Sequence, residues 1–355
     1  MADARVEAAI ANWAPRFVAQ GVDYNDFIRT TAGIERWEDW LAAWSATGDL
    51  HATLAAEAER AGRSLTAGKA HVRAALCYHF AKFVWMVDMD RYREAAGQAV
   101  ASLYAAHHHL DPTAERVEMI LDGATMVGNL RRSDRGTRPP LVVLVPGLDS
   151  TKEEFFNWEN VFLERGMATF SLDGPGQGET GFATHIRPDY EVAVATALDA
   201  LGGRSDLDPE RVGVAGVSLG GYYAPRAAAF EPRLRAAVAI GGPFDFGECW
   251  DRLPSITRDT FIHHSGSRDQ RQGAGRASEL SLAGVAERIR QPLLVVFGKQ
   301  DRLIPWQQAE RLAAEAPSAE LVMYPEGSHV CNNIPYKYRP LVADWLAERL
   351  SDRSP

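Results

Sequence analysis

The chain has 355 residues, of which 46% are hydrophobic and 24% are charged. This is the composition of a folded globular protein, and the length suits two domains or one elaborated domain. Lysine and arginine total 38 against 47 aspartates and glutamates, and the net charge of −9 argues against nucleic acid or an anionic membrane as partners.

The cysteines and the N-terminal segment indicate in which cellular compartment the protein is expected. Cys77, Cys249 and Cys331 form no C-x-x-C pair and are too few for a disulfide framework. Asp3, Arg5 and Glu7 interrupt any apolar stretch near the N-terminus, and no run approaches the ~18 apolar residues of a membrane helix. We therefore expect a soluble, cytoplasmic protein.

Residues 1–112 are expected to form an all-helical N-terminal domain. Apolar positions recur at intervals of three and four within Ala55–Glu59 and Tyr92–Ala106, which is typical of helices. Asp111-Pro112 then ends the helical pattern. The remaining residues, 113–355, are expected to form a separate catalytic domain.

Residues 113–355 alternate between strand-like and helix-like segments. Asp122-Gly123 predicts a hairpin, and Leu141–Val145 is a short apolar run of the kind buried inside a parallel sheet. Repeated strand–helix units predict an α/β fold with a doubly wound, mainly parallel sheet. Residues 246–290 break this rhythm after the sixth strand, so we interpret them as an insertion.

The strongest chemical signal is the G-x-S-x-G motif at Gly216, Ser218 and Gly220. A β-branched strand leads into the motif and a helix is expected to leave it, so the glycines would form a sharp turn that exposes the serine hydroxyl. A plain glycine-rich turn is the alternative. Two partners later in the chain favour a nucleophile.

Asp301 follows the expected strand Leu293–Phe297, and His329 follows the next strand, Glu320–Tyr324. In the order Ser218, Asp301, His329, the histidine would accept the serine proton and the aspartate would orient the imidazole. Taken singly, Asp301 could cap a helix and His329 could be a surface residue. Asp245 and Glu248 follow an earlier strand and are rival carboxylates.

Two backbone N–H groups are expected to form an oxyanion hole. One belongs to Leu219, directly after the nucleophile, and the other to Leu148, in the loop that follows Leu141–Val145. The loop Asp173–Gly178 lacks the spacing of a phosphate-binding motif, so we interpret it as a structural turn.

We expect neither a metal nor another cofactor. His107, His108 and His109 are consecutive, and consecutive helical side chains point about 100° apart, so the three cannot easily share one ion.

Tyr222 lies one helical turn after Ser218 and is a candidate substrate contact. Tyr78 and Trp85 are weaker candidates, since helices commonly bury aromatic residues.

Four segments resemble one α/β-hydrolase subfamily, which includes 2,6-dihydroxypseudooxynicotine hydrolase and fungal pigment-pathway enzymes that shorten a polyketide. They are Gly147–Glu154, Asp173–Gly178, Gly216–Arg226 and Gly327–Asn333. The resemblance implies a serine triad, a helical domain that covers the sheet and a homodimer. It also implies hydrolysis of a carbon–carbon bond beside a ketone, with Glu248 matching a glutamate implicated beside the triad. A solvated carboxylate of the insertion is the equal alternative for Glu248.

Three functions remain open. The resemblance favours C–C hydrolysis of a small-molecule 1,3-diketone or acyl-phenol, in which a second acid such as Glu248 would help to protonate the departing carbon. A carboxylesterase would use the same triad. A non-catalytic binding protein on this scaffold would have no need of all three groups together.

Overall fold

The computed structural model of the protein describes residues 3–133, 135 and 138–351, which form two compact units. The first unit runs to Ala114 and also includes Glu153–Asn157 and Pro254–Thr260, whereas the second contains the rest of the described chain. The sequence predicted a single division after residue 112. The sequence did not predict the two added segments, because local periodicity indicates whether a segment is a helix or a strand. It does not indicate the hydrophobic core in which that segment is buried.

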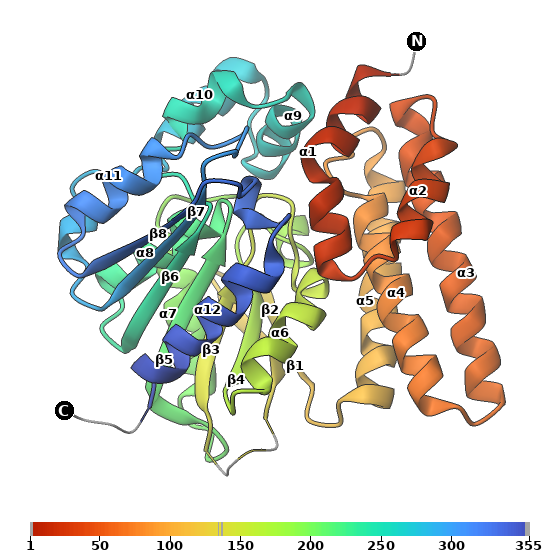
Figure 1. Ribbon diagram of the computed structural model, residues 1–355, viewed down its shortest axis with the longest axis horizontal. Helices are drawn as coiled ribbons and strands as arrows, with labels where there is room; N and C mark the ends of the chain where they lie inside the picture. The colour runs from red at the N-terminus through yellow and green to blue at the C-terminus, as the bar shows by residue number, and fades with distance from the viewer. Residues whose placement is uncertain (1–2, 134, 136–137, 352–355) are drawn as a thin grey trace. The chain divides into compact units, whose positions relative to one another are not determined.

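Five helices of the first unit are labelled in Figure 1, and they confirm the helices expected at 55–59 and 92–106. They are α1 (Ala4–Gln20), α2 (Tyr24–Ala32), α3 (Trp40–Arg60), α4 (Ser64–Ala81) and α5 (Met89–Leu110), with a 3₁₀ turn at Trp37–Asp39. The carboxylates of Asp3, Asp23 and Asp88 cap α1, α2 and α5 by accepting backbone N–H bonds.

Aromatic side chains form the core of the first unit. The rings of Phe17 and Phe80 stack with centroids 3.8 Å apart, and Phe17 also contacts Trp40 and Trp44. All four side chains are fully buried. Such large apolar surfaces account for much of the free energy that holds a small helical unit together.

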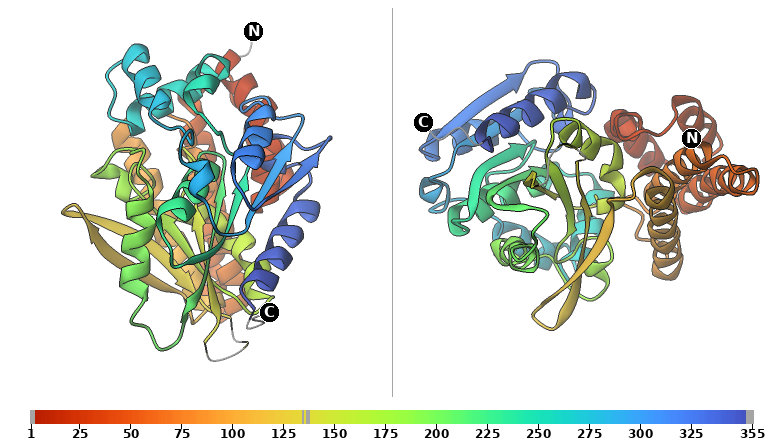
Figure 2. Two further views of the ribbon diagram at one scale, coloured as in Figure 1. Left: turned by 90° about the vertical axis from the view of Figure 1, so that its left-hand side faces the viewer. Right: turned by 90° about the horizontal axis from the view of Figure 1, so that it is seen from below.

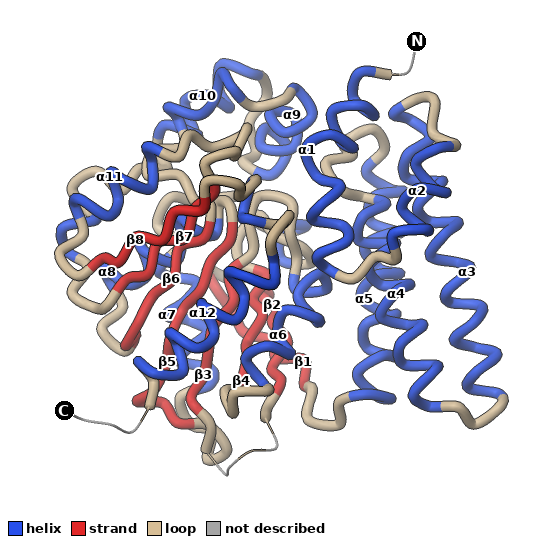
Figure 3. The backbone as a smooth tube through the Cα atoms, viewed as in Figure 1, coloured by secondary structure: helices blue, strands red, loops and turns tan. Residues whose placement is uncertain are grey.

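The second unit contains one eight-stranded sheet, drawn in red in Figure 3. Its strands lie in the order β1-β2-β4-β3-β5-β6-β7-β8, and every pair from β4 to β8 is parallel. The strands are β1 (Glu115–Leu121), β2 (Ala124–Arg131), β3 (Pro140–Val145), β4 (Ala168–Asp173), β5 (Asp208–Val217), β6 (Leu234–Ile240), β7 (Leu293–Gly298) and β8 (Ala319–Tyr324). This arrangement confirms the predicted α/β-hydrolase fold.

The expected hairpin at Asp122-Gly123 joins β1 to β2, which pair antiparallel. Both turn residues have positive φ, +52° and +83°, as the favoured two-residue hairpin turn requires. β2 then pairs antiparallel with β4, so the hairpin forms one edge of the sheet.

Helices cover both faces of the sheet, as the two views of Figure 2 also show. A Cβ at Gly213 of β5 would lie 3.0 Å from Leu346 of α12, and one at Gly216 would lie 3.1 Å from Ala224 of α8. These glycines are three residues apart, so they face opposite sides of the sheet. The helices are α6 (Phe156–Leu163), α7 (Glu191–Leu201), α8 (Gly220–Phe230), α11 (Gln307–Glu315) and α12 (Pro335–Arg349).

The predicted insertion lies between β6 and β7. It contains α9 (Ser255–His264), α10 (Gln270–Ser278) and 3₁₀ turns at Gly247–Arg252 and Ala286–Arg288. Within residues 3–133, 135 and 138–351, no helix combines the length and the apolar character needed to cross a bilayer.

Candidate active site

Ser218 lies in the sharp turn between β5 and α8, with a φ of +55°. The flanking glycines make this turn possible. A Cβ at Gly216 would lie 1.9 Å from the carbonyl oxygen of Gly220, and a Cβ at Gly220 would lie 2.3 Å from that of Val145. A non-glycine residue at positive φ is uncommon, and such strain recurs at functional sites. The turn therefore has the geometry of a nucleophile elbow.

His329 and Asp301 meet Ser218 from the loops that follow β8 and β7. His329 Nε2 is 2.9 Å from Ser218 Oγ, and His329 Nδ1 is 2.7 Å from Asp301 Oδ2. The second oxygen, Asp301 Oδ1, accepts the backbone N–H groups of Leu303 and Ile304 at 2.8 and 3.0 Å. The aspartate side chain is only 1% exposed. The two backbone hydrogen bonds fix the Asp301 carboxylate, so its Oδ2 atom holds the imidazole of His329 in one orientation.

Close packing of two glycines brings the loops of Asp301 and His329 together. A Cβ at Gly298 would lie 2.2 Å from the carbonyl oxygen of Gly327. Val330 and Cys331, directly after the histidine, have φ values of +57° and +54°. The backbone is thus bent sharply at His329, which places the imidazole between a carboxylate and a hydroxyl. This arrangement is suited to moving a proton from Ser218 Oγ to His329 Nε2.

Gly147 brings the loop after β3 against the nucleophile. A Cβ at Gly147 would lie 2.9 Å from Ser218 Cβ and 3.1 Å from the carbonyl oxygen of Val217. The next residue is Leu148, and Leu219 follows the serine. In the described part of the chain, the N–H groups of Leu148 and Leu219 donate no described hydrogen bond. They are therefore available to an oxyanion that develops beside Ser218.

A second loop, which follows β4, supports the loop of Gly147. Gln177 Nε2 donates to the carbonyl oxygens of Pro146 and Gly147 at 2.7 and 3.0 Å. Gln177 Oε1 in turn accepts the backbone N–H of Gly174 and the hydroxyl of Tyr190. The segment Asp173–Gly178 was interpreted from the sequence as a structural turn, and that interpretation missed the contact of Gln177 with the loop of Gly147. The only sequence signal of Gln177 is a polar residue in a glycine-rich turn at a strand end.

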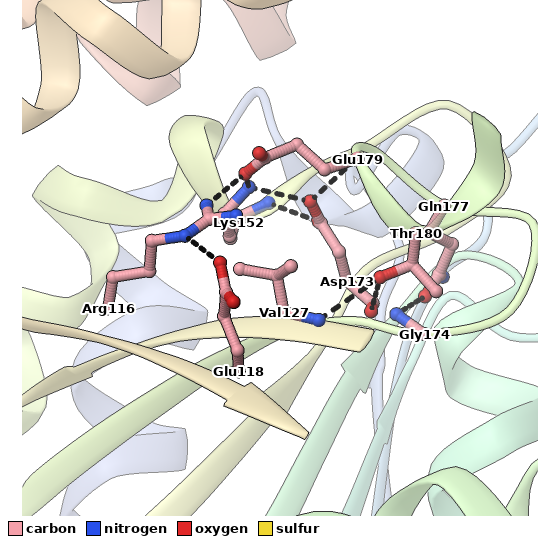
Figure 4. Close-up of polar contacts among 9 residues, drawn as sticks. All are labelled: Arg116, Glu118, Val127, Lys152, Asp173, Gly174, Gln177, Glu179 and Thr180. Carbon is pink, nitrogen blue, oxygen red and sulfur yellow. Dashed lines mark hydrogen bonds and ion pairs between the residues drawn. The ribbon is translucent and has the colours of Figure 1, made fainter. Parts of the chain in front are cut away.

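Buried charges anchor the same two loops, as Figure 4 shows. Lys152 Nζ lies 2.8 Å from Asp173 Oδ2 and 2.6 Å from Glu179 Oε2, and the lysine side chain is fully buried. Arg116 from β1 also pairs with Glu179. Burial raises the pKa of Glu179, but Lys152 and Arg116 outweigh it, so the net shift is downward. The Glu179 carboxylate therefore stays ionised, and together with Asp173 it holds the lysine in place.

Among the described residues, no hydrogen bond joins Glu248 to Ser218, Asp301 or His329. The carboxylate of Glu248 accepts hydrogen bonds from Gln308 Nε2 at 2.7 Å and from Arg311 Nη1 at 3.2 Å, and its side chain is 53% exposed. Gln308 also accepts the backbone N–H groups of Phe244 and Asp245. Glu248 thus helps to hold the start of the insertion against α11.

The three aromatic candidates are packed into cores. The hydroxyl of Tyr222 donates to the carbonyl of Pro188, and its side chain is fully buried. Within the helical unit, Tyr78 donates to Asp49 and Trp85 Nε1 donates to the carbonyl of Trp37. These contacts give them packing roles, because their polar atoms are already bound by the protein.

Comparisons with known proteins identify the family and the fold of the chain. Residues 17–351 match a family described as esterase FrsA-like. The chain is 32% identical over 350 residues to 2,6-dihydropseudooxynicotine hydrolase of Paenarthrobacter nicotinovorans, which covers 97% of this chain and 93% of that protein. A crystal structure of 2,6-dihydroxy-pseudo-oxynicotine hydrolase, also 32% identical, superposes with a TM-score of 0.88 over 96% of both chains.

A fungal relative is similar over a shorter stretch. The chain is 32% identical over 254 residues to 20-hydroxy-prefusarin hydrolase of Gibberella moniliformis, and it spans 60% of the length of that protein. Both curated relatives are hydrolases. The resemblance stated from the sequence motifs is thereby confirmed.

Proposed function

Because the chain belongs to the esterase FrsA-like family of α/β-hydrolases and is a hydrolase, we propose that Ser218, His329 and Asp301 are its catalytic triad. The observation that carries this proposal is the 2.9 Å separation of His329 Nε2 and Ser218 Oγ, with Asp301 bound to the far side of the imidazole. A binding protein would have no need of this alignment, which serves proton transfer.

We propose that the substrate is a small ketone, of the 1,3-diketone or acyl-phenol type, and that a carbon–carbon bond is cleaved. Ser218 Oγ would attack the carbonyl carbon while His329 takes the hydroxyl proton. The N–H groups of Leu148 and Leu219 would stabilise the resulting oxyanion. The C–C bond would then break, with its electron pair leaving as an enolate that His329 protonates. Water would hydrolyse the acyl-enzyme and regenerate Ser218.

A carboxylesterase is the second candidate, and the contacts of Glu248 favour it. Since that carboxylate is bound by Gln308 and Arg311, His329 is the only acid that a described hydrogen bond places at Ser218. An alkoxide leaves without needing a second acid, whereas a carbon leaving group must be stabilised as an enolate or protonated.

A substrate panel separates the two functions. Purified protein is given activated esters, 1,3-diketones and acyl-phenols, and the carboxylic acid products are quantified by chromatography. We expect diketone or acyl-phenol cleavage, lost by about 10³-fold or more in Ser218→Ala. Ester turnover with no cleavage of any ketone would identify an esterase. Unchanged activity of Ser218→Ala towards all substrates would refute the triad.

The same panel tests Glu248. With its carboxylate bound at the surface, we expect Glu248→Gln to change ester and ketone cleavage equally and by less than about threefold. A selective loss of ketone cleavage would instead place Glu248 among the groups that protonate the leaving carbon.

We further infer that the enzyme is a cytoplasmic homodimer. Its three cysteines are free and buried, which suits a reducing compartment, and the dimer follows the resemblance described above. Sedimentation equilibrium of the purified protein measures the mass directly, and a monomer at all concentrations would contradict the dimer.

A further inference from the structure

Three side chains with metal-binding atoms meet at one end of the helical unit. Glu59 lies in the last turn of α3, His109 in the last turn of α5, and His71 on α4 between them. The Nε2 atoms of His71 and His109 lie 2.8 and 3.0 Å from the same oxygen, Glu59 Oε1. All three ligand atoms fall within 4.8 Å of one another.

The backbone packing explains why the two histidines face each other. A Cβ at Gly68 of α4 would lie 2.5 Å from Leu110 Cγ and 2.9 Å from His109 Cβ, so only glycine lets the end of α5 approach α4 so closely. His71 is three residues after Gly68 and therefore shares its helix face. The imidazole rings of His71 and His109 are nearly parallel, at 7°, with centroids 6.0 Å apart.

The electrostatics of this corner suit a cation. The carboxylate of Glu59 lies at the C-terminal end of α3, where the helix dipole is already negative, and α5 ends beside it. The histidine side chains are 14% and 16% exposed and that of Glu59 is 40% exposed, so an ion can reach all three ligands from solvent.

We propose that Glu59, His71 and His109 bind one divalent transition-metal ion, with an open position for water. Two imidazole nitrogens and one carboxylate oxygen match the ligand preferences of Zn²⁺ and its neighbours, and not those of Mg²⁺ or Ca²⁺. The ion would join three successive helices, α3, α4 and α5, through one ligand from each. Of the consecutive histidines noted in the sequence, only His109 takes part, because its partners come from other helices.

The site lacks one feature of a tight metal centre. Across the described residues, His71 Nδ1 is buried without a hydrogen-bond partner, although ligating histidines usually donate their second N–H to an acceptor. We therefore expect reversible binding that stabilises the helical unit, and not an ion retained through purification.

Titration calorimetry of the full-length protein with ZnCl₂ tests the proposal. The wild type is expected to bind about one equivalent of Zn²⁺. His109→Gln and Glu59→Gln are each expected to weaken binding by about tenfold or more. His108→Gln is the matched control: it is the adjacent histidine and is exposed, and its loss should leave the affinity unchanged.

Two further measurements distinguish the loss of a metal ligand from misfolding of the variant. Far-UV circular dichroism confirms that each variant is folded, and the visible absorption of added Co²⁺ reports the nitrogen and oxygen ligands directly. Zn²⁺ should raise the midpoint of thermal unfolding in the wild type and in His108→Gln, but not in His109→Gln. The proposal is overturned if the wild type binds no Zn²⁺, or if Glu59→Gln and His109→Gln bind it as tightly as the wild type. The cluster would then be a hydrogen-bonded ion pair alone.

Discussion

At the scale of single residues, Gln177 is the side chain whose role in catalysis can be tested most sharply. Its amide donates to the carbonyls of Pro146 and Gly147, and so holds the loop that carries the N–H of Leu148. Gln177→Leu removes both bonds. We expect kcat to fall by about 100-fold with little change in KM, because a shift of about 1 Å in a positioning group has an effect of that size.

Tyr190→Phe is the control for this prediction. It removes the hydrogen bond to Gln177 Oε1 but leaves the two donated by Nε2. Its kcat should stay near the wild-type value even if its thermal stability falls. Gln177→Leu should also weaken a boronic acid that mimics the tetrahedral intermediate, in parallel with kcat. Equal losses of kcat in the two variants would show that Gln177 acts only through stability.

The contrast between Ser218 and Gln177 shows which residues a sequence can reveal. Ser218, Asp301 and His329 each follow a strand of the parallel sheet. Because the ends of parallel strands lie at the same edge of a sheet, the sequence could predict that these three residues converge. Gln177 contacts backbone carbonyls of another loop. No residue pattern encodes such contacts, because any amino acid supplies the same carbonyl.

At the scale of elements, a buried ion pair joins α1 to the 3₁₀ turn Lys152–Phe155. The guanidinium of Arg16 binds both oxygens of Glu154, at 2.7 and 2.6 Å. Burial raises the pKa of the Glu154 carboxyl, but Arg16 and His79 outweigh it and lower the pKa well below its usual value. Arg16→Met leaves a buried carboxylate without its partner, so we expect the free energy of unfolding at pH 7 to fall by about 3–5 kcal/mol.

The pH dependence of unfolding distinguishes this ion pair from simple packing. In the wild type, the stabilisation by Glu154 is complete above the unfolded pKa of about 4.3 and is lost as the pH falls below it. In Arg16→Met, burial raises the pKa of Glu154, so protonation between pH 7 and 5 should relieve the destabilisation. The deficit of Glu154→Gln should stay constant over that range. Urea unfolding at pH 5, 6 and 7 would contradict the prediction if the Arg16→Met deficit did not shrink.

Local patterns located most helices and strands but missed where each element is buried. The segment after β3 forms a 3₁₀ turn, Lys152–Phe155, followed by α6, and Glu153–Asn157 belongs to the helical unit. Glu154 and Phe155 are fully buried there. The periodicity of the sequence could not show this, because the partners of Glu154, Arg16 and His79, lie on helices more than 70 residues earlier in the chain.

At the scale of the whole molecule, the helical unit contains segments from later in the sequence, so we expect that the N-terminal helices cannot be detached. It consists of the chain up to Ala114 together with Glu153–Asn157 and Pro254–Thr260. Deleting residues 1–114 would leave Glu154 without Arg16 and His79, and would leave the ring of Phe156 without that of His107, 5.7 Å away. The fragment 115–355 would then expose apolar side chains and a carboxylate that the full chain buries.

We expect the fragment 115–355 to aggregate or to unfold without cooperativity, whereas the full chain unfolds in a cooperative transition. Size-exclusion chromatography and thermal unfolding of the two proteins, expressed side by side, provide the comparison. The full chain carrying Ser218→Ala is the control, since it is inactive but retains every segment of the helical unit. A soluble fragment that unfolds cooperatively and hydrolyses an activated ester would contradict the prediction, because 153–157 and 254–260 would then fold without the helices.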